Sequence, residues 1–391
     1  MKWFGRKAVR ETGRPFLLAG WPFGGLRTGG AFAAEPWPRS YEAQVREAYL
    51  HNPVAQRCVR LVAESVAWAP VFAGEARPEA AALLTPGLLE NVATQLLLHG
   101  NAYVQLLQDA EGLPAELFAL RPERVTVEAD GAGWPAAYCY KVPSTGSGQG
   151  ARTRIPAKDG LGRPGLVHLK AAHPLDDHYG LPCLSAAAGA IAVHNAAARW
   201  NKALLDNAAR PSGALVYEPG DGAALSGEQY DRLRAEMEAQ FSGSENAGRP
   251  LLLEGGLKWQ AMSLTPADMD YIALKAGAAR EIALAFGVPP LLLGLPSDVT
   301  YANYREANRA LWRQTVLPMA DRILRGLSEA LASWWPGLKL EVDLDRIGAL
   351  ASEREKLWRQ VSAAKFLTDA EKRELLGFAP TPAGEALRTD A

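Results

Sequence analysis

The chain has 391 residues, of which 48% are hydrophobic and 22% charged, and its 42 Lys and Arg residues nearly balance 43 Asp and Glu residues. The length exceeds the ~250–300 residues beyond which one hydrophobic core usually divides, so we expect two or three lobes. The composition is that of an ordinary globular chain and excludes a disordered one. The net charge of -1 argues against a protein that grips DNA statically, because such proteins usually carry a basic face.

The cysteines and the apolar runs exclude two further classes of protein. Cys58, Cys139 and Cys183 are isolated, which indicates neither a disulfide framework nor a thiolate zinc site and favours synthesis in a reducing compartment. No apolar run reaches the ~18 residues that span a bilayer, so we predict no membrane segment. Residues 1–39 are basic but interrupted by glycines and Pro22, which favours a flexible arm over a signal peptide.

Residues 40–100 read as helices. Ser40 is an N-cap candidate for helical spacing that continues to Ala67, with a break at Pro53. A second helix is expected over Pro86–His99, ended by Gly100.

Strands follow, so this first lobe is predicted to be α+β. Period-two alternation predicts strands at 103–106, 124–128 and 138–142, with a turn at Glu111 and Gly112. The Gly-, Ser- and Arg-rich segment 143–163 predicts an exposed loop.

An Ala-rich helix is expected over 183–208, and such small side chains suit helices packed closely side by side. After Pro211 comes a small β–α–β–β module, in which Ser226 and Gln229 form a capping-box pattern. The chain then returns through a second helix, with Thr265 as its N-cap and Pro266 at its first position.

The connector between Gly287 and Thr300 is the most informative segment. Gly287 is a candidate for a left-handed helix end, and Pro289 and Pro290 block continuation of the helix. An apolar run at 291–294 precedes a polar tip. Connectors of this length without structure of their own tend to be functional, and this one lacks a nucleophile–base pair, so its role reads as mechanical.

The pattern of the C-terminal third predicts a helix, a strand and a second helical region. A helix over 301–331 should be kinked by Pro318, and alternation at 338–344 predicts a strand. Residues 348–378 read as helical, with a capping box from Thr368 to Glu371.

Two clusters could carry chemistry. His168, His173 and His178 lie near Asp176 and Asp177, a density that metal sites use; the five-residue spacing matches neither helix nor strand geometry and favours loop polar residues instead. Asp343 and Asp345 would share one strand face as a possible Mg²⁺ pair. No GxxxxGK[ST], G-x-S-x-G or HExxH pattern occurs, so we predict no enzyme, no cofactor and no bound metal.

Five segments together resemble the portal proteins of tailed phages and gene transfer agents, which are ring-forming head–tail connectors. They occur in the family's order and are NPVAQRCVRLVAESVA at 52–67, LLLHGNAYVQLLQDAEGLPAELFALRPERVTV at 96–127, LVHLK with HYGLPCLSAAAGAI within 166–191, NAGRPLLLEGGLKWQAMSLTPADMDY at 246–271, and REIALAFGVPP with LLG, TYANYREA and TVLP within 280–318.

The resemblance implies a portal fold, which is α+β with long stem helices and a short helical crown. The implied divisions are an arm (1–39), the first part of the wing (40–182), a stem helix (183–212), a clip (213–264), a returning stem helix (265–287), a tunnel loop (288–303), the second part of the wing (304–348), a crown (349–378) and a tail (379–391).

The resemblance also implies a non-enzymatic, homo-dodecameric ring at the capsid vertex of a virion or gene-transfer-agent particle. Double-stranded DNA would be packaged and ejected through it, and the large terminase, a head-completion adaptor and the major capsid protein would be its partners. The candidate tunnel-loop residues are Pro296, Ser297, Asp298, Val299, Thr300 and Tyr301. The candidate lumen cations of the stem are Arg199, Lys202 and Lys275, each of which could instead form a salt bridge between subunits.

Two alternatives stay open at this stage. One is a metal-dependent hydrolase that uses His168, His173, His178 and Asp176. The other is a head-associated scaffold protein without a channel, which would not need the closed ring that the portal reading requires.

Overall fold

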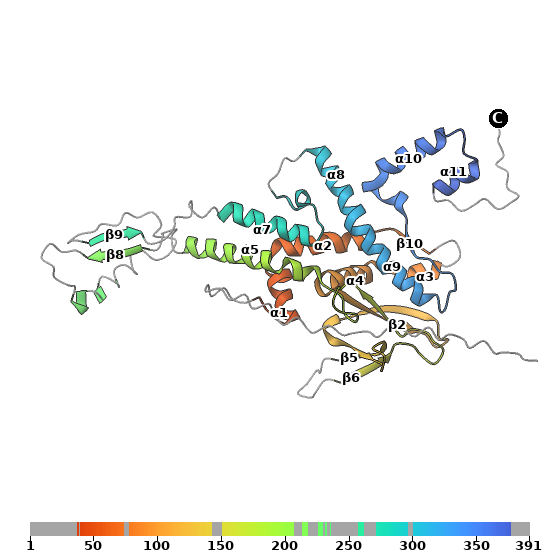
Figure 1. The fold of residues 1–391 in the computed structure, drawn as a ribbon, viewed down its shortest axis with the longest axis horizontal. Helices are drawn as coiled ribbons and strands as arrows, with labels where there is room; N and C mark the ends of the chain where they lie inside the picture. The colour runs from red at the N-terminus through yellow and green to blue at the C-terminus, as the bar shows by residue number, and fades with distance from the viewer. Residues whose placement is uncertain are drawn as a thin grey trace, which may run out of the picture.

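The computed structural model describes residues 37–38, 40–73, 78–142, 151–206, 213–217, 226–229, 231–232, 235, 257–261, 271–295 and 300–376. A mixed body of helices and small sheets carries a long helical hairpin that projects from one side (Figure 1). The α+β class predicted from the sequence is confirmed. Within the described residues, no helix is long and apolar enough to cross a membrane.

The N-terminal helices begin where their caps predict. Helix α1 spans Tyr41–Val45 and continues as a π-helical segment over Arg46–Leu50, and Ser40 Oγ accepts the Ala43 N–H at 3.3 Å. Helix α2 spans Pro53–Ala67, α3 spans Pro78–Ala82 and α4 spans Pro86–His99. Gly100 ends α4 in the left-handed conformation with φ 76°, as predicted, because glycine adopts this conformation without steric cost.

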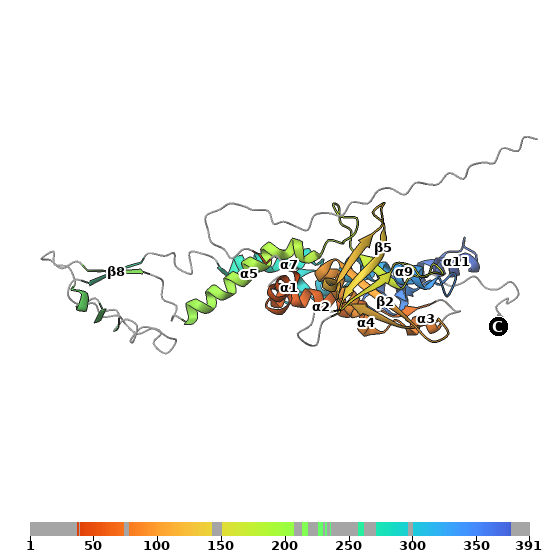
Figure 2. The same ribbon diagram turned by 90° about the horizontal axis from the view of Figure 1, so that it is seen from below.

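Two three-stranded antiparallel sheets lie together against one side of the helices (Figure 2). In the first, β2 (Asn101–Gln108) pairs with β3 (Pro114–Leu120) and with β7 (Leu166–Lys170). In the second, β5 (Pro135–Lys141) lies between β4 (Val125–Ala129) and β6 (Arg152–Pro156).

Strand β6 corrects the prediction of an exposed loop over 143–163. Its register pairs Ile155 with Tyr138 of β5, and Ile155 is the one buried residue of the strand. A strand with a single buried side chain has too little alternation to be found from sequence pattern. Residues 143–150 of that predicted loop lie outside the described residues.

The hairpin consists of α5 (Cys183–Asp206) and α7 (Tyr271–Ala285), which pack along each other. Strands β8 (Gly213–Tyr217) and β9 (Leu257–Ala261) pair antiparallel in the segment that links the two helices. The capping box at Ser226 and Gln229 is formed, with the Gln229 N–H donating to Ser226 Oγ at 3.3 Å and the Ser226 N–H donating to Gln229 Oε1 at 2.9 Å. Residues 251–254, which the sequence pattern predicts to be one strand of the small module, and the predicted Thr265–Pro266 cap lie outside the described residues.

Helix α8 (Tyr301–Leu311) and helix α9 (Leu317–Leu331) are joined by a π-helical turn at Trp312–Val316. The irregularity expected at Pro318 thus takes the form of an expanded turn just before the proline, which lacks an N–H for a regular helix. Helix α9 buries Ile323, Leu324 and Leu327 in the main core, together with α2 and α4.

The strand predicted at 338–344 is wrong in extent. Only β10 (Glu341–Val342) pairs, with β1 (Val71–Phe72), although Leu338 and Leu340 are buried. Asp343 instead caps the short 3-10 turn Leu344–Arg346, and Asp345 pairs with Arg354. The two aspartates therefore do not share a strand face.

The C-terminal helical region is divided in two. A 3-10 turn at Gly348–Leu350 leads into α10 (Ala351–Ala363), and α11 spans Asp369–Leu375. The predicted capping box of α11 is confirmed, because Thr368 and Glu371 cap each other's backbone N–H groups.

The chain that enters the hairpin is held by a close backbone contact between two glycines. A Cβ added to Gly180 would lie 2.0 Å from Gly100 O and 2.7 Å from Ala171 N. Only glycine fits where two backbones approach so closely.

We predict that Gly180→Ala lowers the free energy of unfolding by about 3 kcal/mol, because the backbone atoms around it must move apart. Thermal unfolding measures the loss. Gly160→Ala is the matched control, since its Cβ would meet nothing within 4 Å among the described residues, and it should change stability by less than about 0.5 kcal/mol. Equal melting temperatures for the two variants would contradict the role of the contact.

Candidate functional site

The connector begins with a well-formed helix end. After α7, Gly287 has φ 65°, as its sequence position predicted. The Val288 N–H donates to Ala283 O at 2.9 Å and the Gly287 N–H donates to Leu284 O at 3.0 Å. This pair of bonds is the Schellman arrangement, which satisfies carbonyls at the helix end, and Val288 is buried. The direction in which the connector leaves the helix is therefore fixed.

A hydrogen bond ties this helix end to the π-helical turn between α8 and α9. Thr315 Oγ1 donates to Gly287 O at 2.6 Å. A Cβ on Gly287 would lie 2.7 Å from that same oxygen atom of Thr315. Gly287 is thus required both for its backbone conformation and for this contact.

The far end of the connector is also capped locally. A 3-10 turn at Pro290–Leu293 ends at Gly294 with φ 70°. Thr300 Oγ1 accepts the Asn303 N–H at 3.2 Å and so begins α8. Of the candidate tunnel-loop residues, Thr300 is this N-cap and Tyr301 is the first residue of α8, whereas Pro296, Ser297, Asp298 and Val299 lie outside the described residues.

The three candidate lumen cations are not gathered into one cluster. Arg199 on α5 lies with Nη1 at 3.8 Å from Glu47 Oε2, within its own chain. Lys202 is exposed near the C-terminal end of α5, and Lys275 is half-buried near the start of α7. Arg199 is therefore engaged with the body, and Lys202 and Lys275 belong to different helices of the hairpin.

A buried polar network joins the hairpin to the body. Asn52 is 1% exposed, and its Nδ2 donates to Asn195 Oδ1 at 2.8 Å and lies 3.2 Å from His194 Nδ1. Its Oδ1 accepts the N–H groups of Val54 and Ala55, which caps α2. The sequence analysis missed this network; a polar Asn before Pro53 and a His–Asn pair within an Ala-rich helix were the available signals.

Asn195 and His194 complete this junction from the hairpin side. Asn195 Nδ2 donates to Glu47 O at 2.9 Å. Burial, and to a lesser extent the charge of Lys275, lowers the pKa of His194. A neutral His194 can accept from the Asn52 amide at Nδ1, whereas a protonated ring would present a second donor there.

The three histidines of the candidate metal cluster occupy separate environments. His168 on β7 stacks on Tyr103 with ring centroids 4.3 Å apart, and its Nε2 lies 3.0 Å from Asn101 Oδ1. His173 accepts the Leu175 N–H, and His178 is buried. Among the described residues, which include all three, no group of three potential ligands could hold a metal ion. The structure therefore does not form the cluster that the hydrolase alternative requires.

Asn101 links two partly buried histidines, His99 and His168. Its Nδ2 lies 3.2 Å from His99 Nδ1, and its Oδ1 accepts from Gly180 N as well as facing His168. Burial lowers the pKa of His99 to about 4 and that of His168 to about 3. Both rings are thus neutral near pH 7, and they support the backbone where the Gly180 contact leads into the hairpin.

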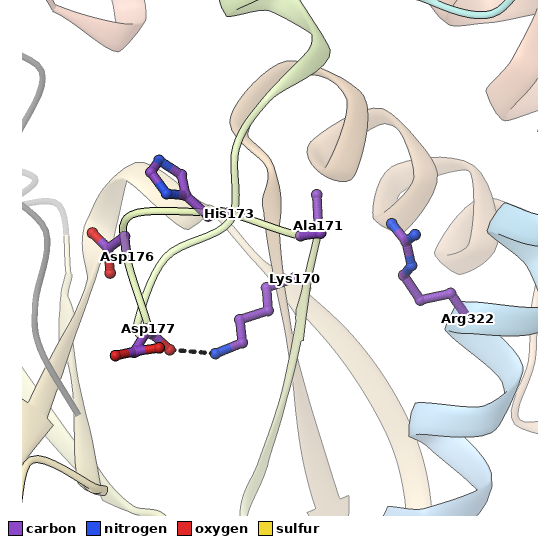
Figure 3. Close-up of a pocket in the computed structure, with 7 residues that line it drawn as sticks. Lys170, Ala171, His173, Asp176, Asp177 and Arg322 are labelled. Atoms are coloured by element: carbon purple, nitrogen blue, oxygen red, sulfur yellow. Dashed lines mark hydrogen bonds between the residues drawn. The ribbon is translucent and has the colours of Figure 1, made fainter. Parts of the chain in front are cut away.

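An open cleft lies between the turn after β7 and helix α9 (Figure 3). Lys170, His173 and Arg322 supply basic groups, and Lys170 Nζ donates to Asp177 O. Asp176 is committed to the turn, because its Oδ1 accepts the N–H groups of His178 and Tyr179. Groups of both charge signs therefore line the cleft.

Comparison with known proteins shows which proteins share this sequence and fold. The family model for phage portal proteins matches residues 53–377. A protein of Rickettsia felis, described as uncharacterized, is 42% identical, with 87% of this chain and 90% of that protein covered. A solved chain from the neck of an empty gene transfer agent particle is 46% identical with a TM-score of 0.67, and covers 88% of this chain and 95% of its own. A chain from the neck of the native particle, computed with C12 symmetry, is 45% identical, with the same TM-score and coverage.

We predict that acid destabilises the chain through His99 and His168. Their pKa values are lowered in the folded state, so the unfolded chain binds more protons, and stability is lost as the pH falls from about 6.5 towards the folded values. Each histidine should cost about 1–2 kcal/mol between pH 7 and pH 5. Thermal unfolding of wild type and His168→Gln at both pH values tests this.

The glutamine variant should be less stable at pH 7 but should lose less stability between the two pH values. An equal loss in both proteins would contradict the assignment to His168.

Proposed function

The chain belongs to the phage portal protein family, and we propose that it forms the portal ring of a gene transfer agent or phage particle. In this role a closed ring at one capsid vertex provides the channel through which double-stranded DNA is packaged and released. The short chain and its Ala- and Arg-rich composition favour the gene transfer agent. Its location is the head–tail junction of the particle.

The observation that carries the proposal is a similarity that extends over nearly the whole chain. The related chain from the neck of a gene transfer agent particle is 46% identical and has 95% of its own length covered. At that identity the hairpin, the connector and the body belong to one shared architecture, so the similarity reaches the elements that would form a channel.

The geometry of the hairpin and connector supports a mechanical role. The connector leaves α7 through a fixed helix end, and Thr315 holds that end against the π-helical turn. These contacts fix where the connector starts, and the Thr300 cap fixes where α8 begins. We assign the tip, Pro296 to Tyr301, to the channel wall.

The charge of the chain supports a channel that DNA can slide through. Because 43 Asp and Glu residues offset the 42 Lys and Arg residues, the chain as a whole lacks the basic excess that grips phosphates, and contacts with the backbone of DNA carry no sequence information. Arg199 lies 3.8 Å from Glu47 within its own chain, so the proposal is tested first on the other two candidates. Lys202 and Lys275 remain the proposed lumen cations.

The partners follow from this role. We assign twelve copies to the ring, and the major capsid protein to the contact with its rim. The module that includes β8 and β9 lies at the far end of the hairpin from the body (Figure 1). That end is the proposed docking site for the large terminase and later for a head-completion adaptor. In the proposed role the protein is not an enzyme and uses no cofactor.

Electron microscopy of the purified chain tests the proposal. We expect closed rings with a central channel wide enough for a DNA duplex and twelve-fold symmetry in the particle. A protein that forms filaments or compact particles without a hole would contradict it, and would favour the scaffold alternative.

We predict that the double variant Lys202→Ala and Lys275→Ala lowers the DNA packaged per particle by about twofold or more without preventing ring assembly, because two phosphate contacts per subunit are lost. Quantification of nuclease-protected DNA measures it. Arg199→Ala is the control and should leave packaging unchanged, since it removes an exposed ion pair worth about 0–1 kcal/mol. A double variant that fails to form rings would place the two lysines at subunit interfaces.

A further inference from the structure

The outer face of the sheet formed by β4, β5 and β6 carries exposed cations. Tyr138 of β5 and Ile155 of β6 point inward, into a core cluster that the two sheets share. Alternate residues of a strand point to opposite faces, so Lys141 of β5 and Arg152 and Arg154 of β6 point outward. All three are exposed, and we call them the basic face. Figure 1 shows β5 and β6 at the lower margin of the body.

Two of these cations lie directly opposite each other. The register of the two strands pairs Lys141 with Arg152. The adjacent pair is hydrogen-bonded, because the Val142 N–H donates to Ala151 O at 2.8 Å. Lys141 and Arg152 therefore form a pair without backbone hydrogen bonds, the kind in which side chains lie closer together. Like charges placed directly opposite destabilise a sheet, so the chain keeps a locally unfavourable pair.

No carboxylate of this chain neutralises that pair in the described part of the structure. Glu128 is the acidic residue of the outer face, and its Oε2 lies 2.7 Å from Arg154 Nε. Among the described residues, neither Lys141 nor Arg152 has a hydrogen-bond or ion-pair partner for its side chain. The sequence that joins the two strands, 143–150, contains no Asp or Glu. Three cations against one carboxylate leave the face with a positive surplus.

The edge of the sheet beside the basic face is open. Strand β6 is the last strand of its sheet within the described residues. Its backbone bonds to β5 at Ala151 and at Ala157, whose N–H donates to Ala136 O at 2.9 Å. Bonding alternates along a strand, so the N–H and C=O groups of Arg152 and Arg154 point to the open side. Such groups can receive a further strand from another chain.

We propose that the open edge of β6 and the basic face together bind an extended acidic segment of another protein. The backbone of the added strand would pair with Arg152 and Arg154, and its acidic side chains would lie beside the cations of the basic face. Charged side chains discourage unselective pairing at an edge, so this edge selects a strand of opposite charge. The inference does not depend on the proposed ring.

An acidic peptide fits this surface better than DNA does. The edge presents both N–H donors and C=O acceptors, and a peptide strand supplies both matching groups. A phosphate backbone supplies acceptors only, so the carbonyl groups of the edge would stay unpaired. The two unneutralised cations are also few beside the roughly 6–10 phosphate contacts of a strongly salt-dependent DNA-binding protein.

Fluorescence anisotropy with the purified full chain tests the charge of the site. The probe is a labelled peptide of about ten residues that alternates glutamate and valine, a typical strand length. The double variant Lys141→Glu and Arg152→Glu should bind it at least about tenfold more weakly than wild type. Lys356→Glu with Lys365→Glu is the matched control, because it reverses two exposed lysines elsewhere and changes the net charge equally. This control should bind the peptide as wild type does.

Backbone methylation of the peptide tests the edge. One version is methylated on its valine nitrogens and the other on its glutamate nitrogens, so that each version loses the N–H donors of one edge. The version methylated on the edge that faces β6 should bind at least about tenfold more weakly, because it loses two or more hydrogen bonds. The other version should bind within about threefold of the unmodified peptide.

Thermal unfolding of Lys141→Glu separates loss of binding from loss of fold. This substitution places opposite charges across the two strands, so the variant should melt at the wild-type temperature or up to about 2 °C higher while it binds the peptide more weakly. A lower melting temperature would show that Lys141 and Arg152 do not oppose each other and would overturn the inference.

Three further results would overturn the proposal. Wild type that does not bind the acidic peptide lacks the site, and an equal loss in the Lys356→Glu and Lys365→Glu control would reduce the effect to net charge. If both methylated peptides bind like the unmodified one, the edge of β6 is not used. If duplex DNA binds and the acidic peptide does not, and charge reversal at Lys141 and Arg152 abolishes DNA binding, the basic face is a phosphate site instead.

Discussion

The arrangement of the molecule depends on one buried amide, that of Asn52. It caps α2 through its oxygen and holds His194 and Asn195 of the hairpin through its nitrogen. A buried amide left without partners costs about 1–3 kcal/mol, so the hairpin and body are fixed together by the requirement that every polar atom of this side chain be satisfied. Because Asn195 in turn bonds to Glu47 O, the first helical segment, α2 and α5 meet at one point.

This junction lets a long projection behave as part of the body. Helices α5 and α7 project from the body (Figure 1). A hairpin attached only by apolar contacts could rotate about its base, because apolar packing is not directional. Hydrogen bonds at Asn52 and the glycine contact at Gly100 and Gly180 define a direction. The proposed ring, in which each subunit would match identical neighbours, needs such a defined direction.

Features that depend on neighbouring residues, such as helix caps, could be predicted from the sequence, whereas contacts between residues far apart in the chain could not. Ser40, Thr368, Gly100 and Gly287 act within a few residues of themselves, so their roles as caps and helix ends were predicted correctly. Strand β6 was missed because it buries only Ile155. The strand predicted at 338–344 was too long. Its leucines alternate with polar residues as in a strand, and Leu338 and Leu340 are buried, but only two residues of the segment pair with another strand.

The candidate functional site shows the same difference between local features and long-range contacts. The connector was predicted from its prolines and glycines, whereas the Thr315 contact joins positions 28 residues apart and leaves no periodic signal. The lumen role of Arg199 stays a prediction, and its contact with Glu47 on another element could not be predicted from a helix end alone. The spacing of the histidines favoured loop polar residues, whereas His168 lies on β7, where Asn101 and Tyr103 give it a structural environment.

Strand β6 has a consequence for a protein that self-associates. It is the last strand of its sheet within the described residues, and Arg152, Thr153 and Arg154 along it are exposed. A bare strand edge is a template for pairing with any other chain, and charged side chains along it discourage such pairing. In the proposed ring, where copies of this chain would lie close together, these arginines would keep neighbouring sheets from pairing edge to edge.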